Sequence, residues 1–130
     1  MKTKKTIFLA VLLAFGLGCG YSKPATTPAV AGTMPNITAL APNSMAAGSA
    51  SFVLTVNGAN FNSNAAINWN GAAQATTHVS ANQLTTTIPA ASIATAGTVS
   101  VTATNPGTAG GLYGGGTSPE TSNSMTFTIN

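Results

Sequence analysis

Charge is almost absent from this sequence, and its absence excludes several kinds of function. Charged residues make up 4% of the 130 residues, and neither Asp nor Arg occurs. The lysines lie mostly at the N-terminus, so after residue 20 only Lys23 and Glu120 carry a charged side chain. A nucleic-acid surface requires several basic side chains to displace phosphate counterions. We therefore expect no nucleic-acid partner.

The shortage of ionisable groups also argues against an enzyme. Glycoside hydrolysis by paired carboxylates requires two acids, and Glu120 is the only acid in the chain. The single histidine, His78, lies in a predicted strand, nothing in the sequence relates it to Glu120, and no G-x-S-x-G motif supplies a nucleophile. One His, one Glu and neutral oxygens form a poor ligand set for zinc or calcium. We predict no catalytic residue, no metal and no cofactor.

Cysteine occurs once, at Cys19, directly after a stretch typical of a secretory signal peptide. A positive region, "MKTKK", precedes an apolar run over residues 7–17, and the small residues Gly16 and Gly18 lie just before Cys19. The run is too short to span a bilayer, which takes about 20 residues. We therefore predict a cleaved signal helix over residues 1–18.

The stretch Leu17-Gly18-Cys19 resembles the lipid-attachment site of bacterial lipoproteins. The resemblance implies cleavage before Cys19, acylation of its thiol, and a membrane partner through the lipid. Gly16 departs from the motif, where Leu is usual, and Gly16-Leu17-Gly18 also suits ordinary signal peptidase. That alternative gives a secreted protein with a free thiol. Because no Asp follows Cys19, the resemblance implies a cell-envelope protein of the outer membrane.

Residues 19–34 predict a disordered tether, rich in Pro and Thr and without apolar periodicity. Proline cannot donate a hydrogen bond to a sheet; Pro24 and Pro28 lie in this stretch, and Pro35 follows it directly. The globular domain is expected over residues 35–130.

Apolar and hydroxyl-bearing side chains alternate with period two through this domain, and the alternation predicts strands. The expected strands lie within residues 36–41, 51–58, 65–71, 84–89, 98–106 and 124–130. One face of them carries the predicted core, which consists of Phe52, Leu54, Val56, Ile67, Trp69, Leu84, Ile88, Val99, Val101, Phe127 and Ile129. Core packing is the expected role of Trp69, and a ligand platform is the alternative.

Turn residues separate the predicted strands. Asn57-Gly58 and Asn70-Gly71 tolerate positive φ, and the second predicts a tight hairpin between the Trp69 strand and residues 72–80. Residues 90–97, after Pro89, predict one helical turn. Six or seven short strands in this length are typical of a β-sandwich.

Several motifs of the domain resemble the IPT/TIG domain. They are the opening "PNITALAP", "TVNGANF", "WNG", "TTIP", and the closing "TNPG" with "SNSMTFTIN". The resemblance covers residues 35–130 and implies an all-β, immunoglobulin-like sandwich of about seven strands. It also implies a non-catalytic spacer, adhesion or contact module. The transcription-factor members contact DNA through basic residues, which this domain lacks.

Residues 108–122, "TAGGLYGGGTSPETS", depart from the family pattern as an inserted Gly-rich loop. Loops at the end of a sandwich often carry binding function, although a neutral insertion costs little to close. The candidate binding residues are Tyr113 in this loop and Asn60, Asn62 and Asn64 in "NGANFNSN".

The sequence thus predicts a cell-envelope lipoprotein that displays one domain for protein contact, adhesion or structure. The alternative is a carbohydrate-binding surface module that uses loop 107–120, because aromatic faces pack on sugars. A subunit of a larger envelope assembly is a third possibility.

Overall fold

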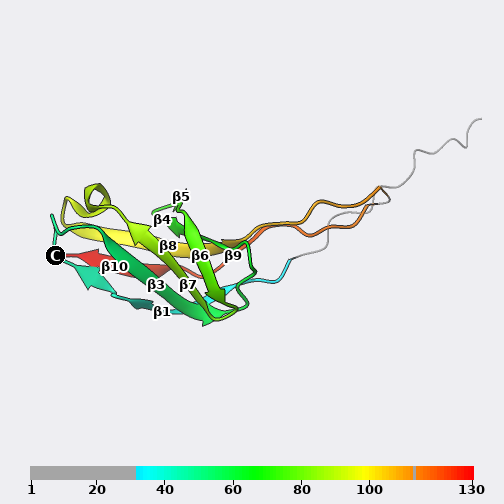
Figure 1. Cartoon of the computed structure of the whole chain (residues 1–130), viewed down its shortest axis with the longest axis horizontal. Coiled ribbons are helices and arrows are strands. Elements are labelled where there is room, and N and C mark those ends of the chain that lie inside the picture. Colours follow the sequence, from blue (N-terminus) through cyan, green and yellow to red (C-terminus); the bar gives the residue numbers. More distant parts are fainter. Residues whose placement is uncertain (1–31, 113) are drawn as a thin grey trace, which may run out of the picture.

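Two β-sheets pack face to face in the computed structural model, which describes residues 32–112 and 114–130 (Figure 1). The predicted signal helix, Cys19 and all of the predicted tether before residue 32 lie outside these residues. The first sheet has the order β1-β3-β7-β6, and the second has the order β2-β10-β8-β4-β5, with β9 paired to β8.

The strands of the first sheet are β1 (Asn36–Ala41), β3 (Phe52–Ala59), β7 (Gln83–Ile88) and β6 (Thr76–Ser80). Those of the second are β2 (Ser44–Met45), β10 (Met125–Ile129), β8 (Gly97–Asn105), β4 (Ala66–Trp69), β5 (Ala72–Ala73) and β9 (Glu120–Thr121). A 3-10 helix, Ala90–Ile93, connects β7 to β8 and confirms the predicted helical turn.

The chain changes sheet early, between β1 and β2. β1 pairs antiparallel with β3, whereas β2 pairs parallel with β10 in the opposite sheet. Pro42 lies between β1 and β2. Because proline has no N–H, it cannot continue the hydrogen bonds between β1 and β3. Four strands facing a sheet built around β10, β8 and β4 form an immunoglobulin-like sandwich. The predicted all-β fold class is confirmed.

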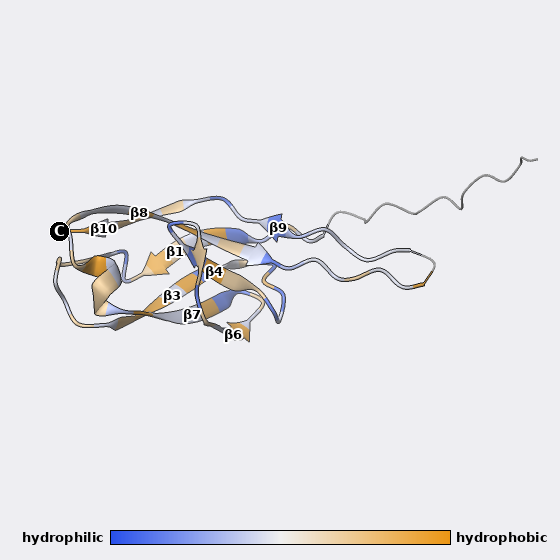
Figure 2. Cartoon of the chain, turned by 90° about the horizontal axis from the view of Figure 1, so that it is seen from above, coloured by the Kyte–Doolittle hydropathy of each residue, from blue (hydrophilic) through white to orange (hydrophobic). Residues whose placement is uncertain are grey.

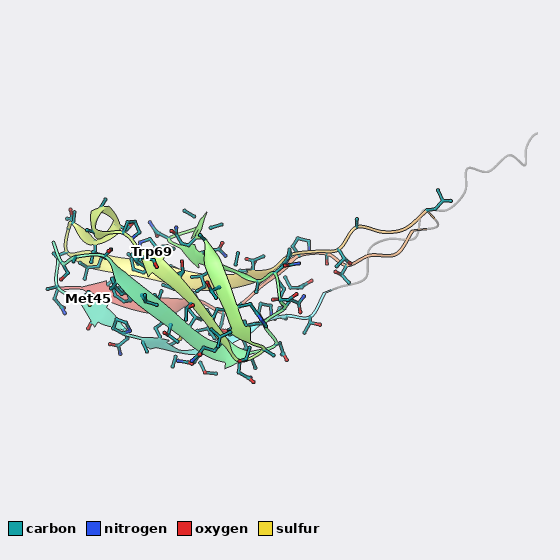
Figure 3. The ribbon with its side chains drawn as sticks, in the orientation of Figure 1. Met45 and Trp69 are labelled. Carbon is teal, nitrogen blue, oxygen red and sulfur yellow. The ribbon has the colours of Figure 1, made fainter. Side chains whose placement is uncertain are left out.

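The core lies between the sheets and is built by the inward residues of the alternating strands. Trp69 of β4, labelled in Figure 3, packs against the ring of Phe127 with centroids 5.0 Å apart. Phe52 stacks on Phe127 as well, with ring centroids 5.5 Å apart. All the predicted core side chains are buried except Phe52, which is half-buried and packs against the rest. Ile37, Leu40, Phe61, Ala65, Ile93 and Ala103 complete the buried set.

β1 buries two residues that are three apart, Ile37 and Leu40, which strict alternation does not allow. The register shifts between Ile37 and Ala39, so a bulge turns both side chains inward. The side-chain amide of Asn123, from the segment before β10, holds this position. Its oxygen accepts a hydrogen bond from Ile37 N at 2.8 Å, and its nitrogen donates to Ile37 O at 2.9 Å.

The predicted turn at Asn57-Gly58 is wrong, because β3 runs through both residues to Ala59. The chain turns at Asn60 instead, where φ is 64°. Gly58 is required for another reason: a Cβ there would overlap the Asn36 carbonyl of β1. Close approach of two strands, rather than positive φ, therefore explains this glycine.

The hairpin at Asn70-Gly71 is present, with φ of 51° and 89° at the two residues. It is shorter than predicted, because only Ala72 and Ala73 pair back onto β4. The chain then crosses to the first sheet, where Thr76–Ser80 pairs with β7. Of residues 72–80, the first two therefore belong to one sheet and the last five to the other.

The two ends of the sandwich differ in what they carry (Figure 1). The C-terminal residue, Asn130, lies at one end, where its carbonyl accepts a hydrogen bond from Ala47 N. Residues 32–35, the loop 60–65 and the segment 106–119 gather at the opposite end, which we call the N-terminal end.

Candidate functional site

The N-terminal end is organised by one buried polar side chain, Asn105 at the end of β8, which is 2% exposed. Its nitrogen donates to Thr33 O at 2.7 Å and to Asn60 O at 2.8 Å. Its oxygen accepts a hydrogen bond from Asn62 N at 2.9 Å. Because each bond reaches a different stretch of backbone, Asn105 ties residues 32–35 and the loop 60–65 to the base of the segment 106–119.

The asparagines predicted to bind a ligand lie in this loop and have different surroundings. Asn60 donates from its side chain to Met34 O at 3.3 Å. Asn62 is exposed, and its backbone N–H is held by Asn105. Asn64 is exposed as well. The structure thus brings Asn60 and Asn62 to the same end as the Gly-rich insertion. The side chain of Asn60 holds residues 32–35, with which the described chain begins and which we call the chain entry.

The segment 106–119, which contains most of the predicted insertion 108–122, forms a two-stranded arm that projects from the N-terminal end (Figure 1). Thr108 and Thr117 exchange backbone hydrogen bonds of 3.0 and 3.1 Å, and Gly111 and Gly114 exchange bonds of 2.9 and 3.0 Å. The threonine hydroxyls add a further contact of 3.1 Å between them. The sequence predicted a loop here, whereas the structure shows a paired ribbon, which we call the arm.

The glycines of the arm allow its two halves to lie close together. A Cβ on Gly107 would overlap the Thr117 carbonyl, and a Cβ on Gly116 would overlap the Thr108 carbonyl. A Cβ on Gly110 would stand 2.5 Å from Gly115 O. By contrast, a Cβ on Gly111 would lie at an ordinary distance of 3.8 Å from Gly114 O. Most of these glycines are therefore required by the arm's own geometry.

Leu112 lies at the tip of the arm and is 92% exposed. Figure 2 shows an arm of intermediate hydropathy with a hydrophobic tip. The arm contains no charged side chain, and Glu120 follows its base, where its Oε1 accepts a hydrogen bond from Ser118 Oγ at 3.1 Å. Tyr113, the predicted ligand contact, lies outside the described residues. Its role therefore stays a prediction.

A second surface of interest covers the outer side of the first sheet. Thr55, Thr85 and Thr77 form a lateral row across β3, β7 and β6. Val53 and Val79 flank this row, 57% and 53% exposed, and Thr87 lies opposite Val53. We call Val53, Thr55, Thr77, Val79, Thr85 and Thr87 the threonine face. It presents hydroxyl groups and two aliphatic side chains without charge.

The two ionisable side chains of the domain lie in different sheets. His78 is on β6, half-buried, with Nε2 3.3 Å from Phe61 O. Glu120 is on β9, which pairs with β8. Within residues 32–112 and 114–130, no group of three His, Cys, Asp or Glu side chains is placed to hold a metal ion.

Stacking on a sugar requires an accessible aromatic face. The four aromatic side chains that the structure describes are three buried ones, Phe61, Trp69 and Phe127, and the half-buried Phe52. Trp69 is 6% exposed, so its indole serves the core and not a ligand platform. Among the residues that the structure describes, no aromatic side chain is therefore exposed for stacking on a sugar.

The described part of the chain contains no helix long and apolar enough to span a lipid bilayer.

The described residues form an immunoglobulin-like sandwich of two sheets. The model of the IPT/TIG domain family matches residues 35–129, which is more than half of the chain. The chain belongs to the IPT/TIG family, a non-enzymatic family of immunoglobulin-like interaction domains. No curated protein matches the chain. No solved structure matches it either.

Three features of the N-terminal end were not predicted from the sequence. In the sequence, Asn105 is only the residue that precedes Pro106-Gly107. Its burial depends on hydrogen bonds to loops that are distant along the chain. Gly32 lies where a Cβ would stand 2.6 Å from Ser118 O, so the chain entry packs against the base of the arm. Leu112 stands out in the sequence only as the one aliphatic residue among glycines.

Proposed function

We propose that this chain is a lipid-anchored, non-catalytic protein of the bacterial cell envelope that displays one IPT/TIG domain for contact with another protein. The N-terminal sequence supports the anchor, because a signal-peptide pattern ends directly before Cys19. Membership in a family of interaction domains supports the contact role.

The observation that carries the contact role is the threonine face. The central parts of protein interfaces are depleted in charged residues, and this face has none. Its hydroxyl groups can donate and accept hydrogen bonds, while Val53 and Val79 offer apolar area that a partner can bury. A surface of this chemistry suits a partner with a similarly neutral face.

The anchor is tested by the intact mass of the mature protein from membrane and medium fractions. We expect a membrane-bound product that begins at Cys19 and carries acyl chains. A soluble product with an unmodified Cys19 would refute the anchor and favour the secreted alternative.

The contact role is tested by photo-crosslinking in intact cells. A benzophenone amino acid replaces Thr87 on the threonine face, and the matched control replaces Thr126, an exposed threonine on the outer side of the second sheet. We expect an adduct of defined mass from position 87 and a weaker one, or none, from position 126. Equal labelling from both positions, or none from either, would contradict a contact at the threonine face.

A further inference from the structure

The arm and residues 32–35 leave the domain at the same end, so an N-terminal anchor would be connected to the end that carries the arm. Gly32 packs against Ser118 and Glu120 at the base of the arm. Asn105 and Asn60 hold the carbonyls of Thr33 and Met34 beside it. Asn130 lies at the other end (Figure 1). A chain anchored through its N-terminus therefore has the arm at the end of the domain from which the tether leaves.

The lengths of the tether and of the arm allow the tip of the arm to contact the surface that holds Cys19. From Cys19 to Gly32 the chain has 13 residues, which reach at most about 45 Å when extended. From Gly107 to Leu112 the arm advances five residues, or about 17 Å for extended chain. The tether is long enough for the tip of the arm to reach the surface that holds Cys19.

The arm also has the chemistry for a lipid interface. Two pairs of residues, Thr108 with Thr117 and Gly111 with Gly114, exchange backbone hydrogen bonds across the arm. These bonds lower the cost of bringing the arm to a lipid interface, because unpaired backbone groups are costly in lipid. No charge has to be desolvated over residues 106–119. The most exposed apolar side chain of the described residues, Leu112, stands at the tip.

From these observations we propose that the arm is a second membrane contact, whose tip inserts Leu112 into the interface of the bilayer that holds the lipidated Cys19. The inference rests on the proposed anchor. One leucine is too weak to hold a free domain on a bilayer, but a short tether raises the effective concentration to the millimolar range. The contact therefore orients an anchored domain, with the threonine face and the C-terminal end left accessible.

The test uses the full-length acylated protein, purified from membranes and reconstituted into phosphatidylcholine vesicles. Because acylation consumes the thiol of Cys19, a new cysteine is the only site for an environment-sensitive fluorophore. Gly111→Cys places it beside Leu112, where a Cβ is tolerated. Ala94→Cys, an exposed position after the 3-10 helix near the opposite end, is the matched control.

We expect the label at position 111 to shift its emission to the blue and to lose access to aqueous iodide, while the label at position 94 stays accessible. Adding Leu112→Ser to Gly111→Cys should reverse both effects. Phosphatidylglycerol or salt should change them little, because the arm is uncharged. Mass spectrometry of the same sample reports acylation, so an unacylated product would refute the anchor rather than the arm contact.

An acylated protein whose label at position 111 behaves like that at position 94 would overturn the inference. Protection that appears without vesicles and grows with protein concentration would overturn it as well, and would assign the tip to a second copy of the chain.

Discussion

Replacing Asn105 with alanine should detach the N-terminal end of the domain without changing its core. The side chain makes three hydrogen bonds, to Thr33 O, Asn60 O and Asn62 N. Alanine can make none of them. Because Asn105 is 2% exposed, water cannot readily replace the lost partner at the buried positions.

The magnitude follows from the number of bonds. A typical intramolecular hydrogen bond contributes about 1 kcal/mol net, and a buried group left without a partner costs somewhat more. Three bonds therefore predict a loss of about 3 kcal/mol, a large part of the 5–15 kcal/mol typical of a domain. For a domain of this size, 1 kcal/mol shifts the melting temperature by about 4–8 °C, so a decrease of roughly 12–24 °C is expected.

The assay is urea and thermal unfolding followed by the fluorescence of Trp69, the only tryptophan in the chain and a core residue. Asn64→Ala in the exposed part of the same loop is the control, and it should change stability by less than about 0.5 kcal/mol. A loss below about 1 kcal/mol in Asn105→Ala would refute the role of this side chain as the tie between the loops.

Three further predictions follow from the same structure. Phe127→Ala removes the ring that contacts both Trp69 and Phe52 and should cost about 3–5 kcal/mol in urea unfolding; a loss under about 1 kcal/mol would contradict the packing described. Gly107→Ala should raise amide hydrogen exchange along the arm, because its Cβ would overlap the opposite backbone, whereas Gly111→Ala should not; equal exchange in both variants would contradict the pairing. Deleting residues 110–115 should leave the melting temperature within about 4 °C of the wild type, since the described residues among them, 110–112, 114 and 115, supply no side chain to the core; a larger loss would show that the arm supports the fold.

The strands were predictable where apolar and hydroxyl-bearing side chains alternate along the sequence. Val99, Val101 and Ala103 alternate with hydroxyl residues, and all three are buried in β8. The bulge in β1 was not predictable from alternation, because the spacing of Ile37 and Leu40 fits neither face until the extra residue is known. Glycine was ambiguous for a physical reason. Gly58 and Gly71 each follow an asparagine, yet one allows two strands to approach and the other allows positive φ.

The candidate site was less predictable than the core, because its order depends on contacts between distant stretches. The arm carries no alternation that could reveal its pairing, since glycine has no side chain to report a face. Asn105 acquires its role from carbonyls 72 and 45 positions away along the chain. The burial of Trp69, in contrast, followed from its place beside Ile67 in an alternating strand.

The placement of the arm changes where a partner should be sought. A loop inserted at the end of an immunoglobulin-like sandwich suggests a ligand site at its tip, as the sequence predicted for residues 107–120. Yet the base of the arm lies beside Gly32, so under the proposed anchor at Cys19 the tip would face the bilayer. The surfaces that then remain accessible are the sheet faces and the C-terminal end. The threonine face has no charge to be screened, and binding to it should therefore change little with ionic strength.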